Sequence, residues 1–192
     1  MKELKQGRKS MFWSYKPLRN GAFEMVTKGA AQDHKGIYGS VATLALKAGG
    51  ASCQKANLDG LKKFENLFLP QLPSAKSNFM DGNEQPVDFG PVQLVGGPHF
   101  SASDKNGKQA FVYLHPSASW SEEETEAFCE LLTVTVESRH GGSARDVWFL
   151  DLRSGKRVPW NNSKKLVRRK CQRAAEFLVA LQEANVVPDE AF

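Results

Sequence analysis

Residues 121–142 read SEEETEAFCELLTVTVESRHGG, and this stretch decides the fold of the second half of the chain. Ser121 and Glu124 form a capping-box pattern. In this pattern the Ser121 hydroxyl accepts from the backbone N–H of Glu124, and the Glu124 carboxylate accepts from the backbone N–H of Ser121. Three acidic residues in the first turn suit the positive end of a helix dipole. Leu132–Val136 alternates like a strand. The cap and the two terminal glycines nevertheless predict a helix.

A predicted hairpin lies on each side of this helix. The first turns at Asn106-Gly107, the strongest short hairpin signal, because a type I′ turn needs positive φ at both central residues. The second turns at Ser154-Gly155. The predicted strands are Val92–Ser103, Gln109–His115, Val147–Leu152 and Lys156–Trp160, and a last helix follows from about Ser163 to Ala184. The second half is therefore predicted as ββαββα, an antiparallel sheet of two hairpins covered by two helices, in an α+β protein.

The first hairpin carries two histidines. If the Asn-Gly pair is a two-residue loop, Phe100 lies opposite Tyr113. His99 and His115 then point to opposite faces of the hairpin, because side chains alternate along a strand. We expect no joint site for these two histidines.

The first half is predicted to be helical and to belong to the same domain. We divide the chain into a basic, aromatic arm at 1–20 and a single α+β domain at 21–192. This domain has a helical part at 21–69, a long loop at 70–91 and a sheet-and-helix part at 92–192. The loop holds four prolines and two glycines without periodicity, which favours a linker or a flap. The aromatics of the arm either stack on bases or pack into the core.

Composition favours a soluble, cytoplasmic protein without membrane association. Hydrophobic residues make up 41% of the 192 residues, an ordinary value for a globular domain. No apolar run approaches the roughly 18 residues of a membrane span. The three cysteines lack a C-x-x-C pair, which argues against a disulfide framework and a zinc site. Sequence motifs for phosphate loops, dinucleotide binding, zinc proteases and serine hydrolases are absent. We expect no cofactor.

Between Leu152 and Arg173 the chain carries nine basic residues and no acid. They are Arg153, Lys156, Arg157, Lys164, Lys165, Arg168, Arg169, Lys170 and Arg173. This block carries +9 while the whole chain carries only +5. Charge segregated in this way creates a local positive field that attracts polyanions.

The last helix places part of this charge on one side. On a helical wheel, Lys165, Arg169 and Arg173 lie opposite an apolar face that we expect to pack on the sheet. We predict that the protein binds nucleic acid, DNA or RNA, without a catalytic centre of its own. The predicted contacts are Arg153, Lys156, Arg157, Lys164, Lys165, Arg168, Arg169 and Arg173. The alternatives are an acidic protein partner and a merely solvated surface.

Asp151 is the second candidate. Asp151-Leu152-Arg153-Ser154-Gly155 follows an apolar strand and precedes a helix that bears Gln172 and Phe177. This stretch resembles the D-x-K-[ST]-G motif of RecB-like nucleases, with Arg153 in place of the lysine. The resemblance implies a Mg²⁺-dependent nuclease in which Asp151 binds the metal and the basic residue orients the attacking water. The second acid would come from Asp146 or Asp104. The simpler reading is a hairpin with a Ser-Gly turn.

Overall fold

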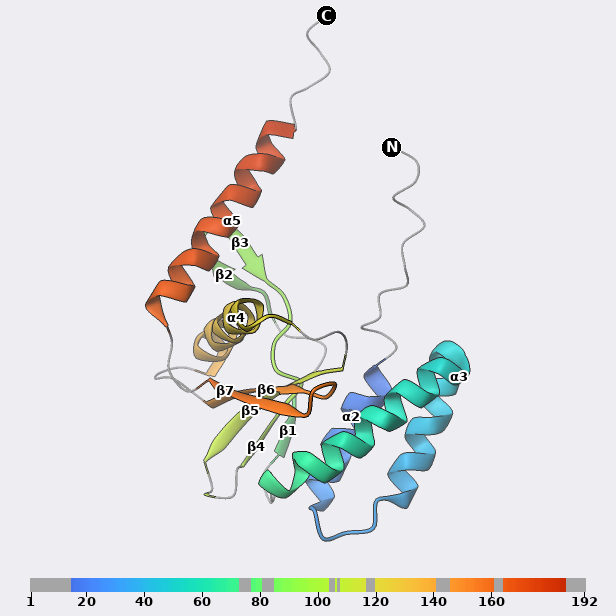
Figure 1. Ribbon diagram of the computed structural model, residues 1–192. Coiled ribbons are helices and arrows are strands. Elements are labelled where there is room, and N and C mark those ends of the chain that lie inside the picture. Colours follow the sequence, from blue (N-terminus) through green and yellow to red (C-terminus); the bar gives the residue numbers. More distant parts are fainter. Residues whose placement is uncertain are drawn as a thin grey trace, which may run out of the picture.

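The computed structural model describes residues 15–72, 77–80, 85–103, 106, 108–116, 120–140, 146–160 and 164–185. Most of the predicted N-terminal arm, residues 1–14, lies outside these ranges. The chain is an α+β protein with a helical N-terminal half, as predicted from sequence, and this half is followed by a mixed sheet (Figure 1). In the part of the chain that is described, no helix is long and apolar enough to cross a membrane.

Two helices form the N-terminal half. Helix α2 spans Lys16–Lys28, and α3 spans Lys35–Leu67 with a kink at Gly49-Gly50, where Gly50 has a φ of 74°. The two helices approach closely at Gly21, because a Cβ there would lie 2.6 Å from Cγ2 of Val41. The short 3₁₀ helix η1, Leu69–Gln71, follows.

The segment 70–91 is not the structureless loop that we expected. It contains strand β1, Ser77–Phe79, and strand β2, Val87–Phe89. Strand β2 pairs with β3, Val92–Leu94, in a separate two-stranded sheet. The predicted strand Val92–Ser103 is therefore two strands, β3 and β4, which belong to different sheets.

The main sheet has the order β1-β4-β5-β6-β7. Its other strands are β4 Phe100–Ser103, β5 Gln109–His115, β6 Asp146–Asp151 and β7 Lys156–Trp160. The prediction of a purely antiparallel sheet is wrong, because β5 and β6 are parallel. Helix α4, Glu122–His140, connects them, and parallel neighbours need such a crossover.

Helix α4 and its cap are confirmed. The backbone N–H of Glu124 donates to Oγ of Ser121 at 3.2 Å, and Oε2 of Glu124 accepts from the Ser121 N–H at 2.7 Å. These two bonds satisfy donors that a helix N-terminus leaves without intrahelical partners.

The sheet has a helical layer on each face (Figure 1). Helices α2 and α3 cover one face, where Phe64 packs with Phe100, Val112 and Leu150. Helix α4 covers the other face, where its apolar side chains pack on Phe111, Tyr113, Phe149 and others. The C-terminal ends of β5 and β6 and the start of α4 therefore meet at one edge of the molecule.

The last helix, α5, spans Lys165–Asn185 and does not pack on the sheet as we expected. It contacts α4 and β3, and its C-terminal half extends away from the sheet (Figure 1). Leu178, which belongs to the apolar face that we expected to pack, is 59% exposed, while Ala175 is buried. Strands β5 and β6 already have α4 on this face, so α5 can only form an outer layer.

Candidate nucleic-acid interface

Part of the basic block is neutralised by acidic residues of α4. Glu130 is fully buried and accepts from Nε of Arg168 at 2.7 Å and from the backbone N–H of Lys164 at 3.0 Å. Nη2 of Arg168 also donates to Glu137 at 2.9 Å. Two further ion pairs between described residues join Lys164 to Glu126 and Lys170 to Glu123. These three cations therefore fasten α5 to α4.

Lys165, Arg169 and Arg173 remain on the outer face of α5. All three side chains are exposed, and none forms an ion pair with any residue that the structure describes. They follow one another at intervals of four residues, which places them along one side of the helix over about 12 Å. Within α5, this row therefore faces solvent without an acidic partner among the residues that the structure describes.

The basic residues of the β6–β7 hairpin do not join this row. Arg157 lies over the ring of Trp148, 4.4 Å from its centroid, on the side of the sheet that α2 and α3 cover. Lys156 lines a cavity on the side of α4. The backbone carbonyl of Arg153 accepts from Nζ of Lys63 of α3 at 2.9 Å. The hairpin thus directs its charges to different faces, because side chains alternate along a strand.

Asp151 stabilises the hairpin turn. Its Oδ1 accepts from the backbone N–H groups of Arg153 and Ser154 at 2.8 and 3.2 Å, and its Oδ2 accepts from Oγ of Ser154 at 2.6 Å. Gly155 closes the turn with a φ of 72°, and its N–H donates to the Asp151 carbonyl at 2.8 Å. These contacts are those of a side chain that caps a turn.

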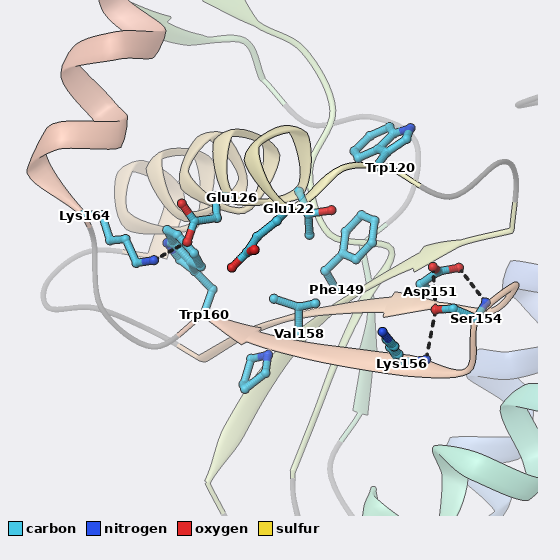
Figure 2. Close-up of a pocket in the computed structure, with 12 residues that line it drawn as sticks. Trp120, Glu122, Glu126, Phe149, Asp151, Ser154, Lys156, Val158, Trp160 and Lys164 are labelled. Atoms are coloured by element: carbon cyan, nitrogen blue, oxygen red, sulfur yellow. Dashed lines mark hydrogen bonds and ion pairs between the residues drawn. The ribbon is translucent and has the colours of Figure 1, made fainter.

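A cavity of about 590 Å³ lies beside Asp151, between the start of α4 and the β6–β7 hairpin. Figure 2 shows Glu122 and Glu126 reaching from α4 toward the hairpin, with Phe149 and Val158 on the opposite wall. Three carboxylates and two lysines line it, together with aromatic rings. The acids make this cavity a poor place for a phosphate, because like charges repel.

The donor set around Asp151 does not fit the Mg²⁺ site that the nuclease motif implies. Within the described ranges, no group of three or more His, Cys, Asp or Glu side chains is placed to hold a metal ion. Asp146 instead pairs with Lys108 at 2.7 Å, and Asp104 lies outside the described residues. We derive no metal-dependent step from this site.

The two histidines of the first hairpin lie on one face of the sheet, contrary to our prediction. Phe100 is paired with Val112, one residue from the predicted partner Tyr113. The ring of His99 stacks on Tyr113 at 4.4 Å, and that of His115 lies 5.1 Å from Phe149. Tyr113 and Phe149 both belong to the core under α4. A shift of one residue in register moves a side chain to the other face, and this explains the error.

Comparison with protein-family models, with curated proteins and with solved structures finds no match for this chain.

The acidic row of α4 is the feature that sequence reasoning missed. Its members are Glu123, Glu126, Glu130 and Glu137. Their spacing of three, four and seven residues places them on one side of a helix. We had explained the first of these acids by the helix dipole alone. The available signal was a row of acids on one side of a predicted helix, in a chain whose last predicted helix is basic.

Proposed function

We propose that the protein binds nucleic acid through the outer face of α5, with Lys165, Arg169 and Arg173 contacting backbone phosphates. The observation that carries this proposal is the row of three exposed cations with no ion pair among the described residues. Such a row can neutralise several phosphates and release their counterions.

Two features of the helix support this proposal. Lys165–Arg169 and Arg169–Arg173 are both pairs of like charges four residues apart, which destabilises a helix. The first turn of α5 also contains no acidic residue, so cations stand at the positive end of the helix dipole. A bound polyanion would relieve both costs.

We propose a smaller set of contacts than the one predicted from sequence. Lys164 and Arg168 already pair with glutamates of α4. Arg153, Lys156 and Arg157 lie in the β6–β7 hairpin, where Lys156 lines the acidic cavity and Arg157 lies over the ring of Trp148. We therefore propose that these five residues contribute less to binding than the row on α5.

The test is fluorescence anisotropy with short single- and double-stranded DNA and RNA over a salt series. Replacing Lys165, Arg169 and Arg173 by Gln should weaken duplex binding at least tenfold at about 50 mM salt. It should also lower the slope of log K against log salt by about 2.7, since each lost phosphate contact removes about 0.9. The matched control replaces Lys35, Lys47 and Lys55 of α3, which are exposed, by Gln.

An unchanged affinity in the α5 variant, or an equal loss in the α3 control, would refute the proposed interface. Absence of binding by the wild-type chain, together with a protein complex that survives nuclease treatment, would favour an acidic protein partner. Cleavage of the probe in Mg²⁺ that is lost in Asp151→Ala would favour the nuclease instead.

A further inference from the structure

The C-terminal half of α5 carries a stripe of exposed apolar side chains. Phe177 and Leu181 are 63% and 43% exposed, and Leu178 beside them is exposed as well. Figure 1 shows that this half of the helix extends beyond α4 and away from the sheet. Large apolar side chains that lie side by side on a surface typically mark a site of association with another molecule.

The apolar stripe, Phe177, Leu178 and Leu181, does not lie on the side of α5 that packs on the rest of the protein. Ala175 is buried and marks that side. At about 100° per residue, Phe177 lies about 160° around the helix from Ala175, and Leu181 lies about 120° from it. A closer approach of α5 to α4 would therefore leave both side chains in solvent.

The flank of α5 beside this stripe changes sign along the helix. It carries Arg169 and Arg173 in the N-terminal half and Glu176 and Glu183 in the C-terminal half. All four side chains are exposed, and none forms an ion pair with any residue in the described ranges. On a helical wheel the four lie within about 80° of one another.

This change of sign makes the flank complementary to itself when it is reversed. In an antiparallel pair of identical helices, the same flank of each helix meets the other, and the start of one lies beside the end of its partner. The cations of one α5 would then lie beside the acids of the other. Charged pairs on the flanks of an apolar seam determine the partner and the orientation of paired helices.

We propose that the apolar stripe of α5 binds a second copy of this chain, with the two α5 helices antiparallel. When Phe177 of one copy lies against Leu181 of the second copy, Arg173 comes within about one helical turn of the second copy's Glu183. A two-fold axis repeats both contacts, as is usual in homodimers. The apolar side chains are buried, and the flanks pair opposite charges.

The same charges argue against a lipid surface as the occupant. Amphipathic helices that lie on membranes present basic residues beside their apolar face. Here the acidic Glu176 and Glu183 lie beside the stripe, where an anionic surface would repel them. A contact limited to one helix from each copy is smaller than a standard interface, so we expect a Kd of about 10–100 µM.

The dimer does not rest on the proposed binding of nucleic acid. Lys165 and Arg169 lie nearer the start of α5 than the overlapping segment, and Arg173 lies at its edge. The two ideas are tested separately, because association is measured in the absence of nucleic acid.

The test is analytical ultracentrifugation of the full chain from about 5 to about 500 µM, which should show one copy at the lowest concentration and two at the highest. Replacing Phe177 and Leu181 together by Gln should weaken association at least tenfold, because it removes the apolar seam. The matched control replaces Leu44 and Leu46 of α3, which are about half exposed, by Gln and should change nothing. Circular dichroism melting checks that each variant folds.

A charge exchange tests the antiparallel orientation. Arg173→Glu and Glu183→Arg should each weaken association about threefold or more, because each places like charges beside one another. The variant that carries both changes should recover most of the loss, since the pair is restored with its signs exchanged. Failure of the double variant to recover would overturn the antiparallel arrangement.

A chain that stays monomeric at about 500 µM would overturn the dimer. So would a dimer that the Phe177 and Leu181 variant does not weaken, or an equal loss in the α3 control. A monomer that this variant destabilises would show instead that another segment of the same chain covers the stripe. A monomer that sediments with anionic vesicles, and loses this in the variant, would show a lipid surface in place of the second copy.

Discussion

The side chain of Glu130 joins three elements of this protein through its hydrogen bonds. It is fully buried, and it accepts hydrogen bonds from Trp160, from the backbone of Lys164 and from Arg168. A buried carboxylate is tolerated when its oxygens are paired in this way. Glu130 thereby connects α4, the end of β7 and the start of α5.

We expect Glu130→Ala to lower the free energy of unfolding by about 3–5 kcal/mol, because it leaves the buried part of Arg168 without its main partner. Urea unfolding followed by circular dichroism measures this loss. The control is Glu123→Ala, whose side chain is 81% exposed and, among the residues that are described, pairs with Lys170. It should cost less than about 0.5 kcal/mol. Equal losses in the two variants would contradict the role assigned to Glu130.

Two local features that depend only on neighbouring residues in the chain were predicted correctly. The capping box of Ser121 and Glu124 and the Ser154-Gly155 turn are both confirmed. The faces of His99 and His115 were predicted wrongly, since they depend on the register between two strands. Register depends on packing, and an error of one residue reverses the face.

At the scale of elements, the β6–β7 hairpin is built around a glycine. Gly155 has a φ of 72°, and a Cβ there would lie 2.9 Å from Cδ1 of Leu67 of α3. The turn therefore favours glycine for its backbone conformation, and a side chain there would also displace the end of Leu67.

Gly155→Ala should lower the free energy of unfolding by about 1–2 kcal/mol, from backbone strain and from the contact with Leu67. The matched control is Gly39→Ala in α3, where a Cβ meets nothing within 4 Å. That change should stabilise the protein by about 0.5–1 kcal/mol, because alanine favours the helix interior. Thermal unfolding of the two variants should shift in opposite directions. A stabilised Gly155→Ala variant would show that the turn tolerates a side chain.

At the scale of the whole molecule, α5 lies outside the main sheet, whose two faces are covered by other helices. It packs on α4 and β3, while Phe177 and Leu178 remain 63% and 59% exposed. Ion pairs with α4 provide much of its attachment. A helix with few buried apolar contacts opens at lower free energy than the core of a sheet.

Hydrogen exchange should therefore be faster in the amides of α5 than in those of β5 and β6. Mass spectrometry of peptides from these elements measures the difference. Glu130→Ala should accelerate exchange in α5 further than in β5 and β6, because it removes the buried partner of Arg168. Equal protection of α5 and the sheet in the wild-type chain would show that α5 belongs to the same cooperative unit.

The α+β class, the helix from Glu122 to His140 and the segregation of basic charge after Leu152 followed from the sequence by itself. They are properties of consecutive residues: periodicity, caps and local charge. Only the tertiary structure decided that β5 and β6 are parallel and that α5 packs outside the sheet. It also decided which cations are neutralised, because Glu130 and Arg168 lie 38 residues apart. Contacts between distant residues depend on how whole elements pack, and no local pattern encodes that packing.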